Sequence, residues 1–486
     1  MNVYFTDYFK VSPEDMEKYG AFNISLINDL PVFIDPFLLF NSDKPEYQDL
    51  HQRIIKYISF LREMSEAGPI SKGLIHHWFL FPEVKQNWLG FSKVGNSGSG
   101  LGKNFATALN DNLSTIFTNF GSEQITKGSH LEKLCLIKDG VGKDNISDFT
   151  TNLIKGFLCE YTQKFADLYL NKSQTKSIIV PHSEFGYETR RWIGKKFTLP
   201  YIDGDYLLLT PKDILTKDEA WINKYDIFGD FNDILSAIPN DELRGQINDY
   251  FLRRIPEDAK QREINEAIAK TLRKFPELID RYIRLKEDTG EQAVALSKQK
   301  VLETEAVFIR QVSALIESLR EDSKFYSTAD NTYEEAYKRV LFLKQVIENN
   351  DGYRIFYVKG QPLKRESDLQ LMFRLTWYAS KDDVNTEVNN GRGPVDYKIS
   401  RGSNDSTLVE FKLASNSKLK QNLAKQVEIY KSANQTKKSI KVILYFSAVE
   451  LANVKRVMNE LELTEGKELV LIDAQATNKP SASNAK

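Results

Sequence analysis

The spacing of apolar and polar residues divides the chain into three regions. From residue 1 to about 245, apolar runs such as LPVFIDPFLLF (30–40) and YLLLTP (206–211) predict strands. They alternate with stretches such as LHQRIIKYISFLREM (50–64), whose apolar residues recur at helical spacing. Residues 246–348 carry apolar residues three and four apart with charges between them, which predicts long amphipathic helices. These helices can pack within the chain or pair between chains, and the pattern fits both.

After residue 349 the pattern becomes that of one compact α/β unit. A helix-like segment, LKRESDLQLMFRLTWYA, precedes three short runs with strand-like alternation. A helix, a strand, a helix and a final strand follow, so the predicted order is α-β-β-β-α-β-α-β. The predicted segments span 363–379, 384–389, 394–400, 406–414, 417–433, 441–447, 448–463 and 468–474.

These patterns predict a multidomain α/β protein. The expected parts are a mixed α/β region (1–245), a helical linker or oligomerisation region (246–348), an α/β domain (349–475) and a disordered tail (476–486). The tail and the preceding Gln475, which together read QATNKPSASNAK, lack large apolar residues that could join a core.

Composition narrows the class of protein. The chain has 486 residues, a formal net charge of -1 and a charged share of 27%, as expected of a globular protein without a uniformly basic surface. Its two cysteines are too few for a disulfide framework or a zinc site. The start MNVYFTDYFK does not resemble a secretion signal, and no apolar run approaches the roughly 18 residues that span a bilayer. We therefore expect a soluble, cytoplasmic protein without membrane contact.

Three charged residues stand out in the segment GRGPVDYKISRGSNDSTLVEFK (391–412). Because side chains alternate along a strand, Asp396 faces away from Val395 and Tyr397, and Glu410 and Lys412 share one face. If the two strands pair as a hairpin, all three side chains can meet at one edge of the sheet. Two carboxylates there can hold Mg²⁺, and a nearby lysine can position or activate an attacking water. Phosphodiester hydrolysis is the reaction that uses this combination.

The pattern Asp-x13-Glu-x-Lys, following a helix that carries an acid, resembles the PD-(D/E)xK nuclease superfamily with its restriction-endonuclease-like fold. The resemblance covers residues 360–475 only. It implies an αβββαβ core, Mg²⁺ (or Mn²⁺ in its place) bound by Asp396 and Glu410, and Lys412 beside the attacking water. Glu366 is the implied extra ligand on the preceding helix, although Asp368 is close enough to contest that role. In the family pattern the proline directly precedes the aspartate, whereas here Val395 lies between Pro394 and Asp396. The proline is the least strictly kept position of that pattern.

Further residues match that family. Glu387 falls on the preceding strand, where many members have another acid. Gln426 and Tyr430 are four residues apart on a predicted helix and match the QxxxY pattern of the RecB-like branch. The resemblance implies that this pair steadies the substrate backbone. The alternative is that alternating polar residues merely form the solvent face of a hairpin.

A basic segment beside this constellation suggests nucleic-acid binding. Residues 415–441 contain seven lysines and one acid, which would hold a phosphate backbone without reading bases; Lys418 and Lys425 are among the expected contacts. Arg392, in the turn NNGRG, is another candidate contact. Each residue could instead belong to an ordinary soluble surface. Double-stranded DNA is the substrate that the resemblance implies, and the residues do not exclude RNA.

Two other motifs carry less weight. GNSGSGLGK (95–103) departs from the Walker pattern at Ser97 and Asn104, so a flexible glycine loop is the expected structure. The five histidines are scattered or adjacent, which does not predict a metal site.

The sequence thus predicts a metal-dependent deoxyribonuclease, an endonuclease by expectation, with antiviral defence or restriction as a setting suggested by fold analogy. The rest of the chain is expected to gate activity through homo-oligomerisation by the helical middle region or through a regulatory protein partner. The alternative is a catalytically inactive nuclease fold that binds nucleic acid or serves as a scaffold.

Overall fold

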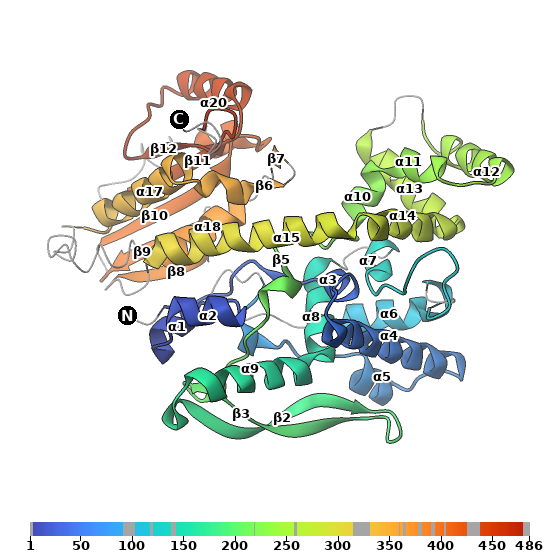
Figure 1. Cartoon of the computed structure of the whole chain (residues 1–486). Helices are drawn as coiled ribbons and strands as arrows, with labels where there is room; N and C mark the ends of the chain where they lie inside the picture. Colours follow the sequence, from blue (N-terminus) through green and yellow to red (C-terminus); the bar gives the residue numbers. More distant parts are fainter. Residues whose placement is uncertain are drawn as a thin grey trace, which may run out of the picture.

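The structure is a computed structural model that describes residues 3–90, 103–116, 120–137, 142–217, 219–256, 260–313, 331–358, 360–362, 366–377, 382–389, 394–402, 405–424 and 438–479. It is a mixed α/β structure whose carboxy-terminal part is built on a five-stranded sheet (Figure 1). In the described part of the chain, no helix combines the length and apolar character needed to cross a bilayer.

Helices dominate the amino-terminal region, which also contains a two-stranded sheet of β1 and β5; α8 packs on β1. The elements are α1 (Phe5–Phe9), α2 (Pro13–Tyr19), β1 (Phe33–Ile34), α3 (Pro36–Phe40), α4 (Pro45–Glu66), α5 (Lys72–Trp78), α6 (Lys103–Ile116), α7 (Lys133–Ile137), α8 (Lys143–Leu153), α9 (Lys155–Tyr169) and β5 (Leu215–Thr216). The helix predicted over 50–64 is confirmed within α4.

Two of the predicted amino-terminal strands are largely wrong. In LPVFIDPFLLF only Phe33–Ile34 is a strand, because Asp35 caps a helix that Pro36 opens; the Asp35 carboxylate accepts a 3.0 Å hydrogen bond from the N–H of Phe37. In YLLLTP only Tyr206 belongs to a strand, and the leucines that follow are buried without strand structure. Short apolar runs report burial more reliably than they report strands.

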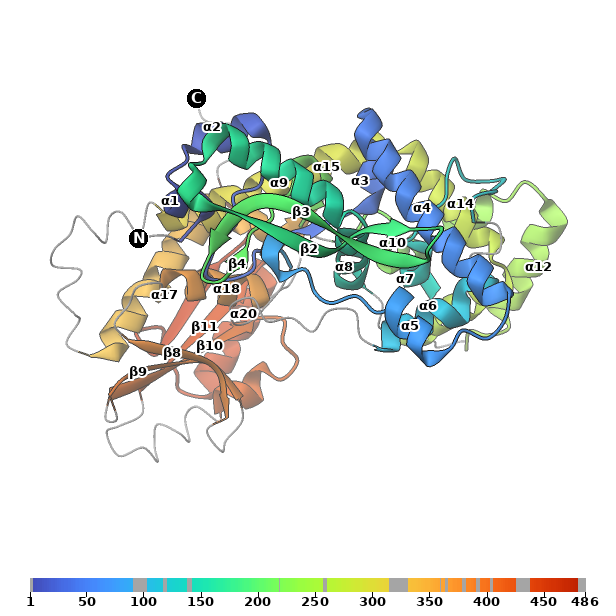
Figure 2. The same ribbon diagram turned by 90° about the horizontal axis from the view of Figure 1, so that it is seen from below.

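A long hairpin was not predicted from the sequence. It consists of β2 (Thr175–Gly186) and β3 (Arg191–Ile202), with β4 (Asp205–Tyr206) added beyond β3. The hairpin lies along α9 on the outside of the amino-terminal region (Figures 1 and 2). Phe185 and Trp192 pair across it and pack on Tyr57 of α4, with ring centroids 4.9 and 5.3 Å away. Aromatic packing therefore fixes its inner face.

Three acidic side chains lie near one another in the amino-terminal region. Asp29 is only 3% exposed, and its carboxylate is repelled by Glu83 and Asp148. Burial, with added repulsion from Glu83 and Asp148, raises the pKa of Asp29 to about 8. Burial followed by repulsion from Glu83 likewise raises the pKa of Asp148 to about 7. Asp29 therefore favours its protonated form in the folded protein.

The amphipathic helices predicted over 246–348 are present. They are α13 (Gln261–Lys274), α14 (Glu277–Asp288) and α15 (Gly290–Glu305), which continues as a π-helical turn over Ala306–Gln311. The helical part begins earlier than predicted, with α10 (Lys224–Gly229), α11 (Phe231–Ser236) and α12 (Asp241–Leu252). Figure 1 shows α15 running from α14 toward the carboxy-terminal sheet, and its side contacts β5 and the residues before β6. These helices pack within the chain; whether they also join two chains stays a prediction.

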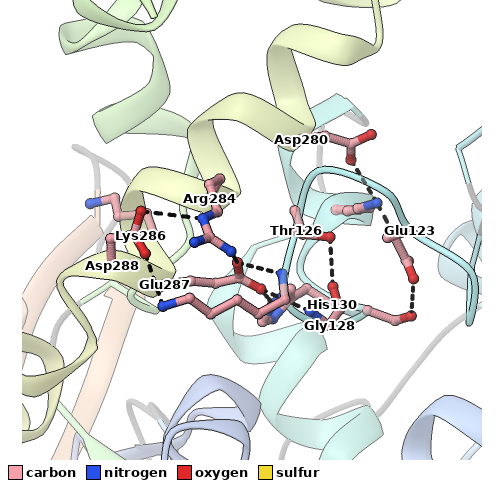
Figure 3. Close-up of polar contacts among 12 residues, drawn as sticks. Glu123, Thr126, Gly128, His130, Asp280, Arg284, Lys286, Glu287 and Asp288 are labelled. Carbon is pink, nitrogen blue, oxygen red and sulfur yellow. Dashed lines mark hydrogen bonds and ion pairs between the residues drawn. The ribbon is translucent and has the colours of Figure 1, made fainter.

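A buried polar network attaches the loop before α7 to α14 (Figure 3). The fully buried Glu287 carboxylate accepts hydrogen bonds from the N–H groups of Lys127 (2.7 Å) and Gly128 (3.0 Å) and contacts Nε2 of His130 at 2.9 Å. Lys133 Nζ lies 2.8 Å from an Asp280 oxygen on the same helix. Burial lowers the pKa of His130, so its ring acts here as a neutral hydrogen-bonding group.

The carboxy-terminal sheet has the order β12-β11-β10-β9-β8. Strands β8, β9 and β10 are antiparallel neighbours, whereas β10, β11 and β12 are parallel. The bounds are α17 (Thr332–Asn349), β6 (Tyr357–Val358), β7 (Gln361–Pro362), α18 (Glu366–Thr376), β8 (Asp383–Asn389), β9 (Pro394–Arg401), β10 (Asp405–Leu413), β11 (Lys438–Tyr445), α20 (Ala448–Glu460) and β12 (Leu469–Asp473). The order of elements predicted from 363 onward is confirmed, with the helix after β10 described at 419–424.

Alternation along the strands gives this sheet two apolar faces. One face, with Val409 and Phe411, joins the large core and is covered by α17 and α18. The other face, with Ile443, packs against Leu419 and Val454 from the helix at 419–424 and from α20. Helix α17 thus packs on the sheet although it begins at Thr332, before residue 349, where the α/β domain was predicted to begin. Glu410 and Lys412 belong by alternation to the second face.

Candidate active site

The candidate site forms where β9 and β10 separate. Their backbone pairing ends at Val409 opposite Tyr397, so the next N–H groups of β10 on that side need other acceptors. Two carboxylates supply them: Asp396 Oδ2 accepts from the N–H of Phe411 at 2.6 Å, and Glu366 Oε1 accepts from the N–H of Leu413 at 3.2 Å. The end of the strand pairing therefore holds both acids in place.

Lys412 lies at the centre of the site. Its Nζ is 3.5 Å from Glu410 Oε1, 3.7 Å from Glu366 Oε2 and 3.8 Å from Asp396 Oδ2, and it donates to the carbonyl of Phe411 at 2.7 Å. The structure therefore brings together the four residues predicted as catalytic. Their side chains are 15 to 28% exposed, so solvent still reaches them.

A second lysine, Lys441, was not predicted as part of the site. It is 6% exposed, and its Nζ lies 3.2 Å from Glu410 Oε2 and donates to the carbonyl of Asn422 at 2.6 Å. Lys441 belongs to the basic run that was expected to hold phosphate. Because Lys441 is buried beside Glu410, it is not exposed to a phosphate backbone as expected.

Burial and charge act in opposite directions in this cluster. Burial raises the pKa of Asp396, although Lys412 and the N–H of Phe411 partly oppose the shift. Burial alone would lower the pKa of Lys412, but the carboxylates of Asp396, Glu410 and Glu366 outweigh it and raise that pKa. Burial lowers the pKa of Lys441 despite the nearby Glu410. Lys412 is therefore held as an ammonium ion.

Asp368 does not contribute to the site. Its side chain is 3% exposed and lies 2.6 Å from Nζ of the fully buried Lys217, which also donates to the carbonyl of Ile355 at 2.9 Å. Asp368 and Glu366 are two residues apart on α18 and so point to different sides of that helix. Glu366 is therefore the acid that faces Lys412, and Asp368 forms a structural ion pair with the amino-terminal region.

The donors of the site suit a hard divalent cation, because three carboxylates surround one cationic group. As they stand, however, no three His, Cys, Asp or Glu side chains in the described part of the chain are spaced to hold a metal ion. The Lys412 ammonium lies within 3.8 Å of an oxygen of each of the three acids.

Several predicted contacts lie outside the described residues. These are Arg392, Lys425, Gln426 and Tyr430, together with most of the glycine loop at 95–103. Glu387 is described only through its backbone in β8. Lys418 lies just before the helix that follows β10, and its side chain is exposed to solvent. Its backbone N–H donates to Asn416 Oδ1 at 2.9 Å.

Comparison with known families gives two matches. Residues 10–223 match a Domain of unknown function (DUF8370), and residues 332–448 match a second Domain of unknown function (DUF8371). No curated protein and no solved structure matches the chain. The second match begins at α17 and contains Glu366, Asp396, Glu410 and Lys412, so the candidate site lies within one matched unit.

Proposed function

We propose that this protein is a divalent-metal-dependent nuclease that hydrolyses phosphodiester bonds of DNA, with a restriction-endonuclease-like carboxy-terminal domain of the PD-(D/E)xK type. The observation that carries the proposal is the convergence of Glu366, Asp396 and Glu410 on Lys412. A purely solvated hairpin face would not bury these groups partly or fix two of them on strand N–H groups.

In this proposal Asp396 and Glu410 hold Mg²⁺, with Glu366 as a further ligand. The bound ion would polarise the phosphate and lower the pKa of a coordinated water. Its entry requires the Lys412 ammonium to withdraw from between the carboxylates. Lys412 then donates hydrogen bonds to the attacking water or to a phosphate oxygen, where charge accumulates in the transition state.

DNA contacts are assigned to residues that lie close to the site residues in the sequence. Lys418 is exposed a few residues after Lys412, and the sequence adds Arg392, Lys425, Gln426 and Tyr430. Lysines that contact phosphates bind without regard to sequence and weaken as salt is added. A role in antiviral defence or restriction belongs to the same proposal and rests on fold analogy.

The test is cleavage of supercoiled plasmid and of a labelled linear duplex by the full chain, with Mg²⁺, Mn²⁺ or EDTA. We expect metal-dependent cleavage that falls at least about 100-fold in Lys412→Ala, because the variant loses the cation that stabilises charge at phosphorus. Lys467→Ala is the matched control, since Lys467 is an exposed lysine of the same domain that pairs with Glu334. A nicked plasmid would identify an endonuclease.

Two results would contradict the proposal. One is cleavage that persists in EDTA or in Lys412→Ala. The other is duplex binding without cleavage under any metal and without Mn²⁺ binding, which would favour a non-catalytic nucleic-acid-binding protein.

A further inference from the structure

Lys441 lies beside the candidate site but has no role in the reaction proposed above. Register across the parallel strands β10 and β11 places it directly opposite Glu410, so the two side chains lie on the same face. Lys441 Nζ lies 3.2 Å from one oxygen of Glu410, Oε2, whereas Lys412 Nζ lies 3.5 Å from the other oxygen, Oε1. The Glu410 carboxylate is thus held between two ammonium groups.

The second contact of Lys441 fixes its direction. The carbonyl of Asn422 accepts from its Nζ at 2.6 Å, and Asn422 lies in the helix that covers this face of the sheet. A buried lysine with two such partners has little freedom to move, because leaving either would leave a polar group unpaired. Lys412, in contrast, lies among carboxylates that can bind another cation.

We propose that Lys441 is a positioning residue for the nuclease site: it fixes Glu410 through Oε2, directs Oε1 toward Asp396 and Glu366, and sets the charge of the site. This inference rests on the proposed function for its substrate, a divalent cation together with a phosphodiester.

Formal charges give the inference a testable sign. The three carboxylates and two ammonium groups leave one negative charge, a divalent cation makes the total one positive charge, and a phosphodiester then brings it to zero. Without the charge of Lys441 the empty site carries two negative charges, and the metal-bound site has none left to attract the phosphodiester. Removing this charge should therefore strengthen metal binding and weaken DNA binding.

The experiment compares full-length wild type with Lys441→Gln, which keeps a hydrogen-bond donor but removes the charge. Mn²⁺ affinity is measured by electron paramagnetic resonance of the free ion. Affinity for a fluorescein-labelled duplex is measured by anisotropy in Ca²⁺, so that neither readout depends on cleavage. Lys441→Arg retains the charge, and Lys438→Gln is the matched control because Lys438 is exposed at the start of the same strand.

We expect Lys441→Gln to bind Mn²⁺ at least about threefold more tightly and the duplex at least about threefold more weakly, with Lys441→Arg near wild type. A merely structural role would weaken both. Weaker Mn²⁺ binding, no change in either affinity, or the same shifts in Lys438→Gln would overturn the inference. Lys441→Met supplies the same comparison if the glutamine variant does not fold.

The two proposals fail in different ways. If wild type cleaves no nucleic acid, but Lys441→Gln binds Mn²⁺ more tightly and the duplex more weakly, the nuclease function fails and the role of Lys441 stands. If wild type cleaves with metal and the shifts are absent, the nuclease stands and the role of Lys441 fails.

Discussion

Replacing Lys217 by methionine should strongly destabilise the folded chain. Lys217 is fully buried, its Nζ lies 2.6 Å from Asp368 Oδ2, and the Asp368 side chain is only 3% exposed. The variant leaves that carboxylate without its cation in a place that water barely reaches. Breaking a buried ion pair by removing one partner costs about 3 to 5 kcal/mol. The carbonyl of Ile355 also loses a donor, which brings the expected loss toward the upper end.

The assay is urea unfolding, followed by circular dichroism and tryptophan fluorescence, with the free energy of unfolding taken by linear extrapolation. Lys44→Met is the matched control, since Lys44 pairs with Asp213 at 2.5 Å but the side chains are 52 and 46% exposed, and such pairs contribute about 1 kcal/mol or less. The double variant Lys217→Met/Asp368→Leu should recover most of the loss, because it leaves no buried charge. A Lys217→Met loss no larger than that of the control, or no recovery in the double variant, would refute the reasoning.

Two further predictions concern buried carboxylates elsewhere in the fold. Asp29 has a folded-state pKa of about 8 against roughly 4 when unfolded, so its contribution to stability is fully present below pH 4 and is lost as the pH rises toward 8. Asp29→Asn has no carboxyl group to ionise. The unfolding free energy of the variant minus that of wild type should therefore increase by up to roughly 3 kcal/mol from pH 5.5 to pH 9. A difference that is the same at both pH values would show that Asp29 does not titrate in this range. Glu287→Ala should cost roughly 3 kcal/mol, since its carboxylate accepts from two loop N–H groups, and should speed hydrogen exchange of the Lys127 and Gly128 amides. Glu277→Ala on the same helix is its control, because Glu277 pairs with Arg281 within α14; equal exchange rates in the two variants would count against the network.

Alternation along the chain predicted the strands of the carboxy-terminal sheet and the shared face of Glu410 and Lys412. That signal is strong because a strand with one buried face allows only one register. A continuous apolar run is a weaker signal: it failed for LPVFIDPFLLF, where a proline after a capping aspartate opens a helix. The long hairpin β2–β3 was missed because its apolar and polar residues do not alternate regularly: Ile178 and Ile179 are adjacent, and Ile179 and Ile193 are exposed (73 and 44%).

Contacts between distant segments could not be derived from local patterns. Lys441 is one of seven lysines in a basic run, and only the register of β11 against β10 places it beside Glu410. The choice between Glu366 and Asp368 had the same limit. Both acids begin one helix, and their roles differ because Lys217, about 150 residues earlier in the chain, takes Asp368.

The two acids at the start of α18 connect the site to the amino-terminal region. Lys217 directly follows β5, which pairs with β1, so its position is tied to the amino-terminal fold. On the same first turn of α18, Glu366 accepts the N–H of Leu413 and faces Lys412. Because Asp368 and Glu366 lie on the same helical turn, the buried ion pair with Lys217 and the carboxylate cluster around Lys412 share one structural support.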